Sequence, residues 1–336
     1  MSITLKDIAK RAKVNVSTVS KALNDSPEIS TETIIRVKKI AQALNYTPNL
    51  AARALVGKGT KTLGLIIPEV SSNYFVKILN SVEDELKRIE YSLIIGITDF
   101  NVKEEIRYLD LFAGRSVDGI LVAGSYYKEV AKKVKELTKS YDIPIIFIQS
   151  FVHFDQFDYI MIDDAHGINK AVSYLKENGH THIGFIGDKT ADMVRQPMFK
   201  AAMEQNELAY DPAMVMRSNS RFEQAGYAGM KELLKSGNVP TAIVAQYDNV
   251  AIGAMKAAYE QGLSIPEDIS FIGYDNIRES EFLECALTTI SPPAQDMARI
   301  GVKLIIGKIN DKKIVATQQV KLLPELIIRE SVNNRL

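Results

Sequence analysis

The sequence contains a single cysteine, Cys285, and this scarcity limits where the protein works. One cysteine excludes a disulfide within the chain, which is typical of a cytoplasmic protein rather than a secreted one. No apolar run is long enough to span a bilayer, and the opening MSITLKDIAKRAK lacks the apolar centre of a signal peptide. We therefore expect a cytoplasmic chain with no membrane partner.

Signatures of catalysis are also missing. No predicted strand is followed by a glycine-rich phosphate loop of the required form, and GFIGDKT at residues 184–190 resembles one only loosely. His180 and His182 lie on the approach to a strand, where a structural role is the usual one, and the histidines lack metal-site spacing. No Ser-His-Asp order or pair of catalytic carboxylates stands out. We expect no enzyme, no metal site and no cofactor.

The chain has no formal net charge, but its charged residues are unevenly distributed. Residues 1–60 hold ten Lys and Arg against four Asp and Glu, which is +6, so the formally neutral chain carries −6 in the remainder. A small basic module on a larger acidic body is typical of nucleic-acid binding. Charge alone fits a solvated basic surface equally well.

The first sixty residues have the pattern of three short helices. In TLKDIAKRAKVNVSTVSKALN, residues 4–24, helical spacing relates two sets of side chains: Leu5, Ile8, Ala9 and Ala12, then Val16, Val19, Ser20 and Leu23. Asp7 and Asn15 suit the starts of these two helices. Ser30 can cap a third helix with an apolar stripe of Ile34, Val37, Ile40, Ala41 and Leu44. This spacing predicts a helix-turn-helix domain.

The second helix of such a domain enters the major groove of DNA, so its exposed face is predicted to contact DNA. The residues suited to base edges are Val16, Ser17 and Lys21. Those suited to phosphate oxygens are Thr18, Ser20 and Asn24. The alternative for Ser17 and Thr18 is that they only stabilise the start of a helix.

The same stretch, followed by NYTPNLAARAL at residues 45–55, resembles the LacI/GalR family of bacterial transcriptional regulators. The helix pair, the third helix and the following segment match in order and spacing, and the likeness covers nearly the whole chain. The resemblance implies a DNA-binding domain at 1–47, a hinge helix and linker at 48–61, and an effector domain behind them. It also implies a homodimer on near-palindromic, double-stranded operator DNA.

In the family, the segment matching residues 49–56 is a helix that forms only when a dimer sits on its operator. A helix this short cannot offset its nucleation cost without packing, which agrees with that behaviour. The resemblance makes Leu55 a wedge between two base pairs, most easily at a pyrimidine–purine step, and turns Asn49, Ala52 and Arg53 to the minor-groove wall or backbone. The alternative for Leu55 is a packing residue of an interdomain linker.

From Thr62 onward, strands alternate with helices. TLGLIIP, YSLIIGI, DGILVAG and IPIIFIQ are nearly continuous apolar runs, as in parallel strands covered on both faces. Helical stretches such as 74–89 and 102–113 lie between them, and the rhythm restarts at DYIMID, HIGFIG, AMVMR, TAIVAQ and ISFIGYD. This predicts two doubly wound α/β units in tandem.

The resemblance implies that these units form a periplasmic-binding-protein-like effector domain. The chain is expected to cross between its two subdomains near Tyr159, Ile290 and Leu322. The predicted subdomains are 62–160 plus 291–321, and 161–290 plus 323–330. A small-molecule effector would bind in the cleft where the strand C-termini of the two subdomains face each other.

The effector-binding residues implied by the resemblance are Tyr74, Phe75, Asp99, Arg195, Phe222, Asp248 and Asp275. Carboxylates and an arginine around aromatic rings suit a hydroxyl-rich ligand, so we expect a sugar or sugar derivative. Met198, where the family usually has glycine, and Tyr247, in place of a small polar residue, indicate a narrower pocket and weaken that expectation. The alternative for each residue is a helix cap or a surface charge.

These features predict a homodimeric DNA-binding repressor whose operator affinity is controlled by the effector. The tail VNNRL has no heptad repeat, which predicts a dimer without a tetramer-forming coil. One alternative is a transport binding protein, opposed by the basic head and the missing signal peptide. The other is a sugar-active enzyme, opposed by the missing catalytic residues and separable by a turnover assay.

Overall fold

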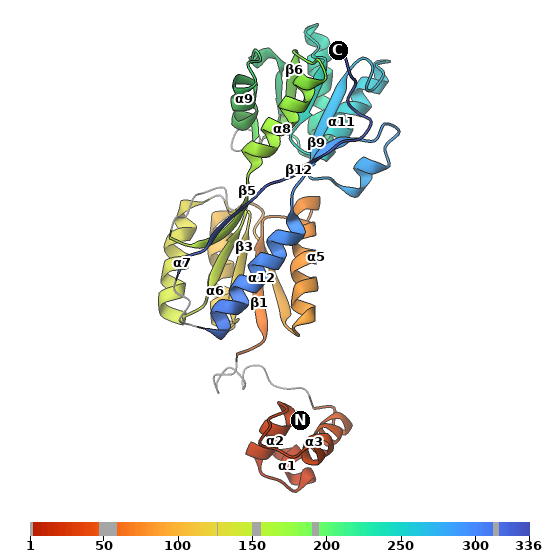
Figure 1. The fold of residues 1–336 in the computed structure, drawn as a ribbon. Helices are drawn as coiled ribbons and strands as arrows, with labels where there is room; N and C mark the ends of the chain where they lie inside the picture. The colour runs from red at the N-terminus through yellow and green to blue at the C-terminus, as the bar shows by residue number, and fades with distance from the viewer. Residues whose placement is uncertain (1–2, 47–58, 126, 150–155, 190–194, 312–315) are drawn as a thin grey trace. The chain divides into compact units, whose positions relative to one another are not determined.

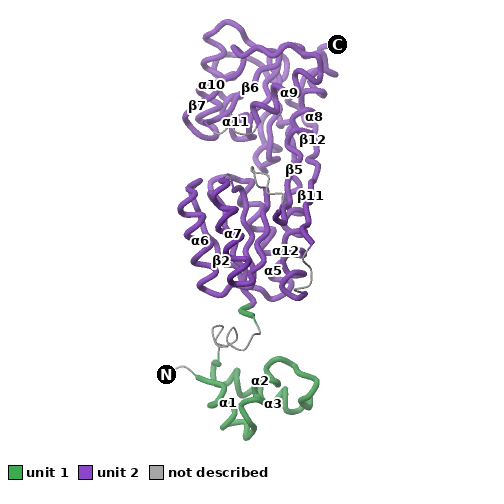
Figure 2. The backbone as a smooth tube through the Cα atoms, turned by 90° about the vertical axis from the view of Figure 1, so that its left-hand side faces the viewer, with its two compact units in different colours: residues 1–60 green, residues 61–336 purple. Residues whose placement is uncertain are grey.

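The computed structural model describes residues 3–46, 59–125, 127–149, 156–189, 195–311 and 316–336. The chain divides into two compact units, residues 1–60 and residues 61–336, which Figure 2 colours separately. Each unit has a core of its own and is described by itself. Over the described ranges, no helix combines the length and the apolar character needed to cross a lipid bilayer.

The first unit is a bundle of short helices within residues 3–46. They are α1 (Leu5–Ala12), α2 (Val16–Leu23) and α3 (Thr31–Ala43). Their shared core consists of small and branched side chains: Ile8, Ala9, Ala12, Val19, Ala22, Val37 and Ala41. The predicted apolar faces therefore meet, and the alanines let the three helices approach one another closely.

Local capping fixes where these helices begin. The Thr4 backbone N–H donates to the Asp7 carboxylate over 2.8 Å, so the acid in the first turn also closes the N-terminus of α1. The Ser30 hydroxyl accepts from the Thr33 N–H over 3.4 Å at the start of α3. Asn15 occupies the N-cap position of α2, but its side chain makes no capping hydrogen bond.

The larger unit contains two lobes, each built on its own sheet (Figure 1). The first lobe has the strands β1 (Thr62–Ile67), β2 (Ser92–Ile97), β3 (Gly119–Ala123), β4 (Ile145–Ile148), β5 (Asp158–Ile162) and β11 (Gln319–Leu322). They are parallel, in the order β11-β5-β4-β3-β1-β2. Every residue of β1, β3 and β4 is buried, as their continuous apolar runs predict, whereas the edge strand β2 exposes Ile95 and Ile97.

Helices cover both faces of this first sheet. One face packs against α5 (Asn73–Arg88) and α12 (Ala294–Asn310), and the other against α6 (Val102–Gly114) and α7 (Lys128–Tyr141). The helices predicted at 74–89 and 102–113 are α5 and α6, each displaced by no more than one residue at either end.

The second lobe repeats this plan. Its strands are β6 (Ile183–Asp188), β7 (Val215–Ser218), β8 (Ala242–Ala245), β9 (Ser270–Tyr274), β10 (Thr288–Ser291) and β12 (Glu325–Ile327). Their order is β12-β10-β9-β8-β6-β7. The edge strand β12 runs antiparallel to β10, which is the one departure from the parallel pairing described for the first lobe.

The helices of the second lobe also pack on both faces of its sheet. One face carries α8 (Asp164–Glu177) and α9 (Arg195–Gln205), and the other carries α10 (Phe222–Ser236) and α11 (Asp248–Glu260). Two short 3-10 turns, η2 (Pro212–Met214) and η3 (Arg278–Glu281), complete it.

Two glycines set the close contact between α10 and α11. A Cβ on Gly226 would lie 1.8 Å from the Val250 carbonyl oxygen, and one on Gly253 would lie 1.9 Å from the Glu223 oxygen. Only glycine leaves room for backbones this close. The contact fixes the N-terminal end of α10, beside the pocket described below.

The chain passes between the two sheets at three places. These lie between β5 and α8 after Ile162, between β10 and α12 at Pro292 and Pro293, and between β11 and β12 at Leu323 and Pro324. The predicted crossings at Tyr159, Ile290 and Leu322 are within three residues of these segments. The N-terminal ends of α8 and α12 therefore lie next to the junction of the lobes.

Candidate functional site

The exposed face of α2 carries most of the residues predicted to contact DNA. Val16 is 40% exposed although it is apolar. Ser17, Lys21 and Asn24 are also exposed, while Thr18 and Ser20 are half-buried. Because Val19 and Ala22 of the same helix are fully buried, the helix has one packed face and one free face.

Two interactions hold side chains on this free face. The Lys21 ammonium group forms an ion pair with Glu28. The Asn24 side-chain amide donates to the Ser20 carbonyl oxygen over 2.5 Å. Both partners of the ion pair are largely exposed, so Lys21 can exchange Glu28 for another acceptor at little cost.

Four further residues predicted to contact DNA lie outside the described residues. They are Asn49, Ala52, Arg53 and Leu55. Their roles stay predictions of the sequence.

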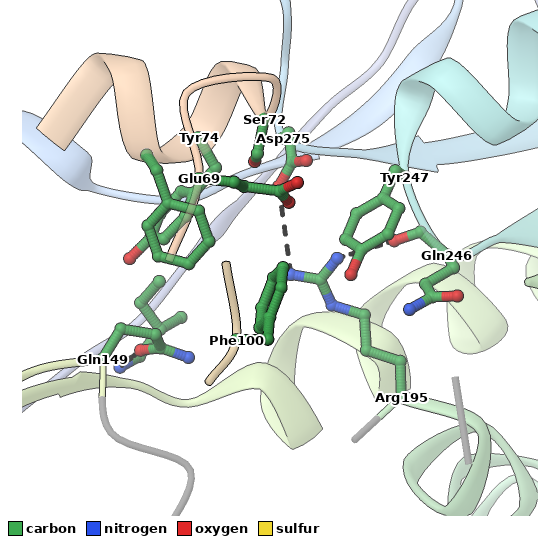
Figure 3. Close-up of a pocket in the computed structure, with 11 residues that line it drawn as sticks. Glu69, Ser72, Tyr74, Phe100, Gln149, Arg195, Gln246, Tyr247 and Asp275 are labelled. Carbon is green, nitrogen blue, oxygen red and sulfur yellow. Dashed lines mark hydrogen bonds and ion pairs between the residues drawn. The ribbon is translucent and has the colours of Figure 1, made fainter. Parts of the chain in front are cut away.

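A pocket in the larger unit lies where the C-terminal ends of both sheets meet (Figure 3). The first lobe contributes Glu69, Ser72, Tyr74, Phe75, Phe100, Gln149 and Ile162. The second lobe contributes Arg195, Gln246, Tyr247 and Asp275. The central cavity is about 30 Å³, room for about two water molecules. A larger ligand therefore requires side chains or lobes to move.

Arg195 is the cation at the centre of this pocket and is only 8% exposed. Its Nη1 donates to the Gln246 carbonyl oxygen over 2.6 Å, and its Nη2 lies 3.4 Å from Asp164 Oδ1 and 3.9 Å from Asp275 Oδ1. Its guanidinium carbon is 3.5 Å from the centroid of the Tyr274 ring. Burial lowers the pKa of Arg195, but Asp164, Tyr274 and Asp275 raise it by more. The guanidinium stays charged.

Two polar atoms of this cluster have no hydrogen-bond partner within the described residues: Arg195 Nε and Asp275 Oδ1. The two side chains are 10% and 5% exposed, and both line the pocket. One atom is a donor and the other an acceptor, so a hydroxyl group, which both accepts and donates, complements the pair. Burial raises the pKa of Asp275 to about 7, against the opposing effect of Arg195.

The wall from the first lobe is mostly aromatic. Tyr74 and Phe75 lie in the first turn of α5 with ring centroids 5.2 Å apart in an edge-on arrangement. Gln149 connects this wall to the second lobe, because its Nε2 donates to Asp164 Oδ2 over 2.7 Å while its Oε1 accepts from the Ile162 N–H over 2.9 Å. An apolar ring face and a hydrogen-bonding amide therefore meet in one wall.

Three pocket residues have left-handed backbones. The φ angles are 54° at Phe100, 51° at Gln149 and 111° at Asp275. Such conformations are unfavourable for residues other than glycine and persist where the surroundings hold them, often in ligand sites. Their concentration around one cavity supports a binding role for it.

Four of the seven predicted effector residues line this pocket: Tyr74, Phe75, Arg195 and Asp275. The other three lie outside its lining: Asp99, Phe222 and Asp248. Asp99 is exposed after β2. Phe222 is half-buried, and its ring centroid lies 6.2 Å from that of Tyr247, the lining residue expected to narrow the pocket.

Asp248 is fully buried and its carboxylate is already occupied. Oδ2 accepts from the Ser280 hydroxyl over 2.6 Å and the Ile277 N–H over 2.9 Å, and Oδ1 accepts from the Thr289 hydroxyl over 2.5 Å. Burial raises the pKa of Asp248. These bonds hold the segment that follows Asp275, so Asp248 orients the pocket carboxylate from behind.

Sequence reasoning missed several lining residues: Glu69, Ser72, Phe100, Gln149, Ile162 and Gln246. A common signal was available, because each lies at or shortly after the end of a parallel strand. Asp164, the buried partner of Arg195, was also missed. It directly follows the apolar run DYIMID, at a helix start where an acid is ordinary.

Metal binding finds no support in the part of the chain that the structure describes, since no three His, Cys, Asp or Glu side chains there are grouped to hold an ion. A wider groove of about 660 Å³ lies by the crossing segments, lined in part by Lys77, Asp84 and Pro292. It is open to solvent, whereas the smaller pocket encloses buried charges, so the smaller pocket is the better ligand site.

Two protein families match parts of the chain. Bacterial regulatory proteins of the lacI family match residues 4–49, and the periplasmic binding protein-like domain matches residues 172–332. The helix-turn-helix head and the two-lobed α/β body expected from the sequence are confirmed by these matches and by the fold.

Relatives that match nearly the whole chain are transcriptional regulators. The transcriptional regulator DegA of Bacillus subtilis is 32% identical over 99% of both chains, and a transcriptional repressor PurR of Histophilus somni is 35% identical over 98% of both. Among solved structures, the lac repressor dimer bound to operator and the anti-inducer ONPF superposes with a TM-score of 0.87 at 22% identity, covering 99% of this chain and 100% of that one. A regulator from Enterococcus faecium with bound ribose has a TM-score of 0.71 at 27% identity, covering 82% and 100%. These relatives are regulators, not enzymes.

Proposed function

Because the chain belongs to the LacI family of bacterial regulatory proteins, we propose that it acts as a homodimeric repressor whose affinity for a near-palindromic operator is set by a small hydroxylated effector. DNA binding and transcriptional regulation follow from family membership. We propose in addition the dimer, the symmetry of the operator, the contact residues and the class of effector.

The observation that carries the proposal is the free face of α2. It presents the apolar Val16, the hydroxyl of Ser17 and the cation of Lys21, with the amide of Asn24 directly after the helix, on a unit with a formal charge of +6 by sequence. These groups suit base edges and phosphates of the major groove. Lys21 would exchange Glu28 for DNA on binding.

The hinge contacts complete the DNA-binding part of the proposal. Asn49, Ala52, Arg53 and Leu55 are proposed to form paired short helices over the minor groove, with Leu55 as the wedge. Support for this comes from the sequence resemblance and from the cost of nucleating so short a helix without a partner.

The effector part rests on the pocket chemistry. A ligand hydroxyl group would complement Arg195 Nε as an acceptor or Asp275 Oδ1 as a donor, and the rings of Tyr74 and Phe75 would pack against a sugar's C–H surface. A sugar or sugar derivative is therefore the proposed class. The regulator from Enterococcus faecium with bound ribose is consistent with this choice.

Coupling would follow from differential affinity. The effector binds one arrangement of the lobes better than another, and only one arrangement lets two hinge helices pair on the operator. An inducer would favour the arrangement that cannot pair them, and a corepressor the one that can.

Selection of binding sites from random duplexes tests the proposal, using the full chain and two variants. We expect a near-palindromic site for the wild type. Lys21→Ala should alter the preferred base at one position in each half-site, at about 1–3 kcal/mol of lost discrimination. Lys39→Ala, which removes an exposed charge from α3, is the matched control and should weaken binding without changing the preferred site. An unchanged site for Lys21→Ala would exclude Lys21 from base reading.

A further inference from the structure

Arg221, the residue before α10, contacts both lobes of the larger unit. Its Nη2 lies 2.8 Å from Glu69 Oε1, in the segment after β1 of the first lobe. Its Nε lies 2.5 Å from Asp188 Oδ2, at the end of β6 in the second lobe. One guanidinium group therefore pairs with a carboxylate from each lobe.

Aromatic rings repeat this two-sided contact. The guanidinium carbon of Arg221 lies 5.4 Å from the ring centroid of Phe100 in the first lobe and 4.6 Å from that of Phe222 in the second. Both distances suit cation–π attraction. A carboxylate and a ring from each lobe thus surround a single cation.

The surroundings make these contacts stronger than those of an ordinary surface pair. The Asp188 side chain is fully buried, and those of Glu69 and Arg221 are 12% and 23% exposed. Burial lowers the pKa of Arg221, while Glu69 and Asp188 raise it by more. The second oxygen of Glu69 accepts from the Ser71 hydroxyl over 2.7 Å, which holds its carboxylate in place.

A second cation joins the same two lobes at another point. Lys77 of α5 donates its ammonium protons to the backbone carbonyl of Asp275 over 2.7 Å and to that of Asn276. Both acceptors directly follow β9 of the second lobe. Two cation contacts therefore cross the junction, and one of them ends on the backbone of a pocket residue.

We propose that Arg221 is a clasp that holds the two lobes closed over the pocket through the protein's own contacts, so that an effector enters or leaves only when the Glu69–Arg221 pair breaks. The proposal concerns regulation of the effector site and rests on the proposed function for the identity of that site. The small central cavity supports it, because about 30 Å³ does not hold a sugar-sized ligand in the arrangement in which the clasp is formed.

The distance between the lobes can be measured directly in the full chain. Lys103 and Lys189 are exposed residues shortly after β2 and directly after β6, one in each lobe, and Lys103→Cys with Lys189→Cys provides sites for two spin labels. Cys285 is buried and its thiol pKa is raised to about 11, so it resists labelling. Pulsed electron–electron double resonance spectroscopy then gives the distribution of distances between the two spin labels, and hence between the lobes.

In the labelled background we expect one narrow, short distance. Arg221→Ala should raise the ratio of open to closed molecules about fivefold, which corresponds to about 1 kcal/mol. Glu69→Gln should raise the ratio of open to closed molecules by less. This second variant keeps the buried Asp188 paired with Arg221, so it tests the clasp even if Arg221→Ala folds poorly. The double variant should match Arg221→Ala alone, because the two side chains act through each other.

Arg88→Ala is the matched control, since it removes an arginine–carboxylate pair of 2.6 Å that lies inside the first lobe. Its distance distribution should equal that of the background. The clasp is refuted if the distributions of Glu69→Gln and Arg221→Ala also match the background. The measurement needs neither DNA nor effector, so its failure is separate from a failure of the binding-site selection that tests the proposed function.

Discussion

The first lobe lines the pocket mainly with aromatic rings, whereas the second lobe lines it mainly with buried polar and charged groups. Tyr74, Phe75 and Phe100 belong to the first lobe, together with the acid Glu69. Arg195 and Asp275 belong to the second lobe, together with the ring of Tyr247. Yet the two sheets have the same strand arrangement, with the edge strand β12 reversed.

The difference shows that two lobes with the same strand arrangement can contribute different chemistry to one pocket. The polar groups of the second lobe form one connected network, in which Asp164 contacts both Arg195 and Tyr274, and Asp248 supports the segment after Asp275. Such a network would fix the positions of a ligand's polar groups, while flat rings would supply contact area with little directional demand. Specificity is therefore expected to change mostly through the second lobe.

The largest expected effect comes from removing the central cation. Arg195→Ala leaves Asp164 and Asp275 buried without their shared partner, which should lower the free energy of unfolding by about 3–5 kcal/mol at pH 8. Urea denaturation of the full chain measures this. The control is Arg299→Ala, which removes an exposed pair with Asp296 in the first lobe and should change little. Equal losses for both variants would contradict the contrast between the lobes.

The second effect depends on pH. The pKa of Asp275 in the fold is about 7, above its unfolded value of 3.8, so the folded state favours the neutral carboxyl group and stability is lost as pH rises toward 7. Asp275→Asn removes this loss, and its stability relative to wild type should rise by about 2 kcal/mol from pH 5 to pH 8. The variant should also lose the effector's influence on DNA binding. A pH-independent difference in urea denaturation would contradict the assignment.

The smallest expected effect comes from a buried acid of the first lobe that lies outside the pocket. Glu105 of α6 is a buried carboxyl of the first lobe outside the pocket, and burial raises its pKa to about 7 against the opposing effect of Ser125. Glu105→Gln should therefore stabilise the chain at pH 8 by about 1 kcal/mol and have less effect at pH 5. Unlike Asp275→Asn, it should leave the effector response intact. Loss of that response would contradict the prediction, because it would show that Glu105 influences effector binding in the pocket.

Much of the fold was predictable because its signals are local. Continuous apolar runs indicated β1, β3 and β4, and helical spacing with Ser30 as a cap indicated α3. The pairing of two lobes and the four lining residues Tyr74, Phe75, Arg195 and Asp275 followed from the family resemblance. Strand ends then located where a pocket must lie.

The rest depended on contacts between distant segments. Asp248 and Asp275 both lie at strand-to-helix turns, yet one carboxylate is occupied by Ser280, Thr289 and Ile277, while an oxygen of the other accepts no hydrogen bond from any residue that the structure describes. Nothing in the local sequence separates them. Arg221 is similar, because its partners Glu69 and Asp188 lie 152 and 33 positions away in the chain.

The three crossing segments restrict how the body can deform. Because three chain segments connect the same two sheets, the lobes are restrained from sliding past each other and from twisting apart. The motion that remains easiest is bending of one lobe relative to the other across these segments. Pro292 and Pro293 stiffen one passage, because each ring fixes its φ angle, and the axis of rotation should lie close to it. Such a rotation would change the separation between Glu69 of the first lobe and Arg221 of the second.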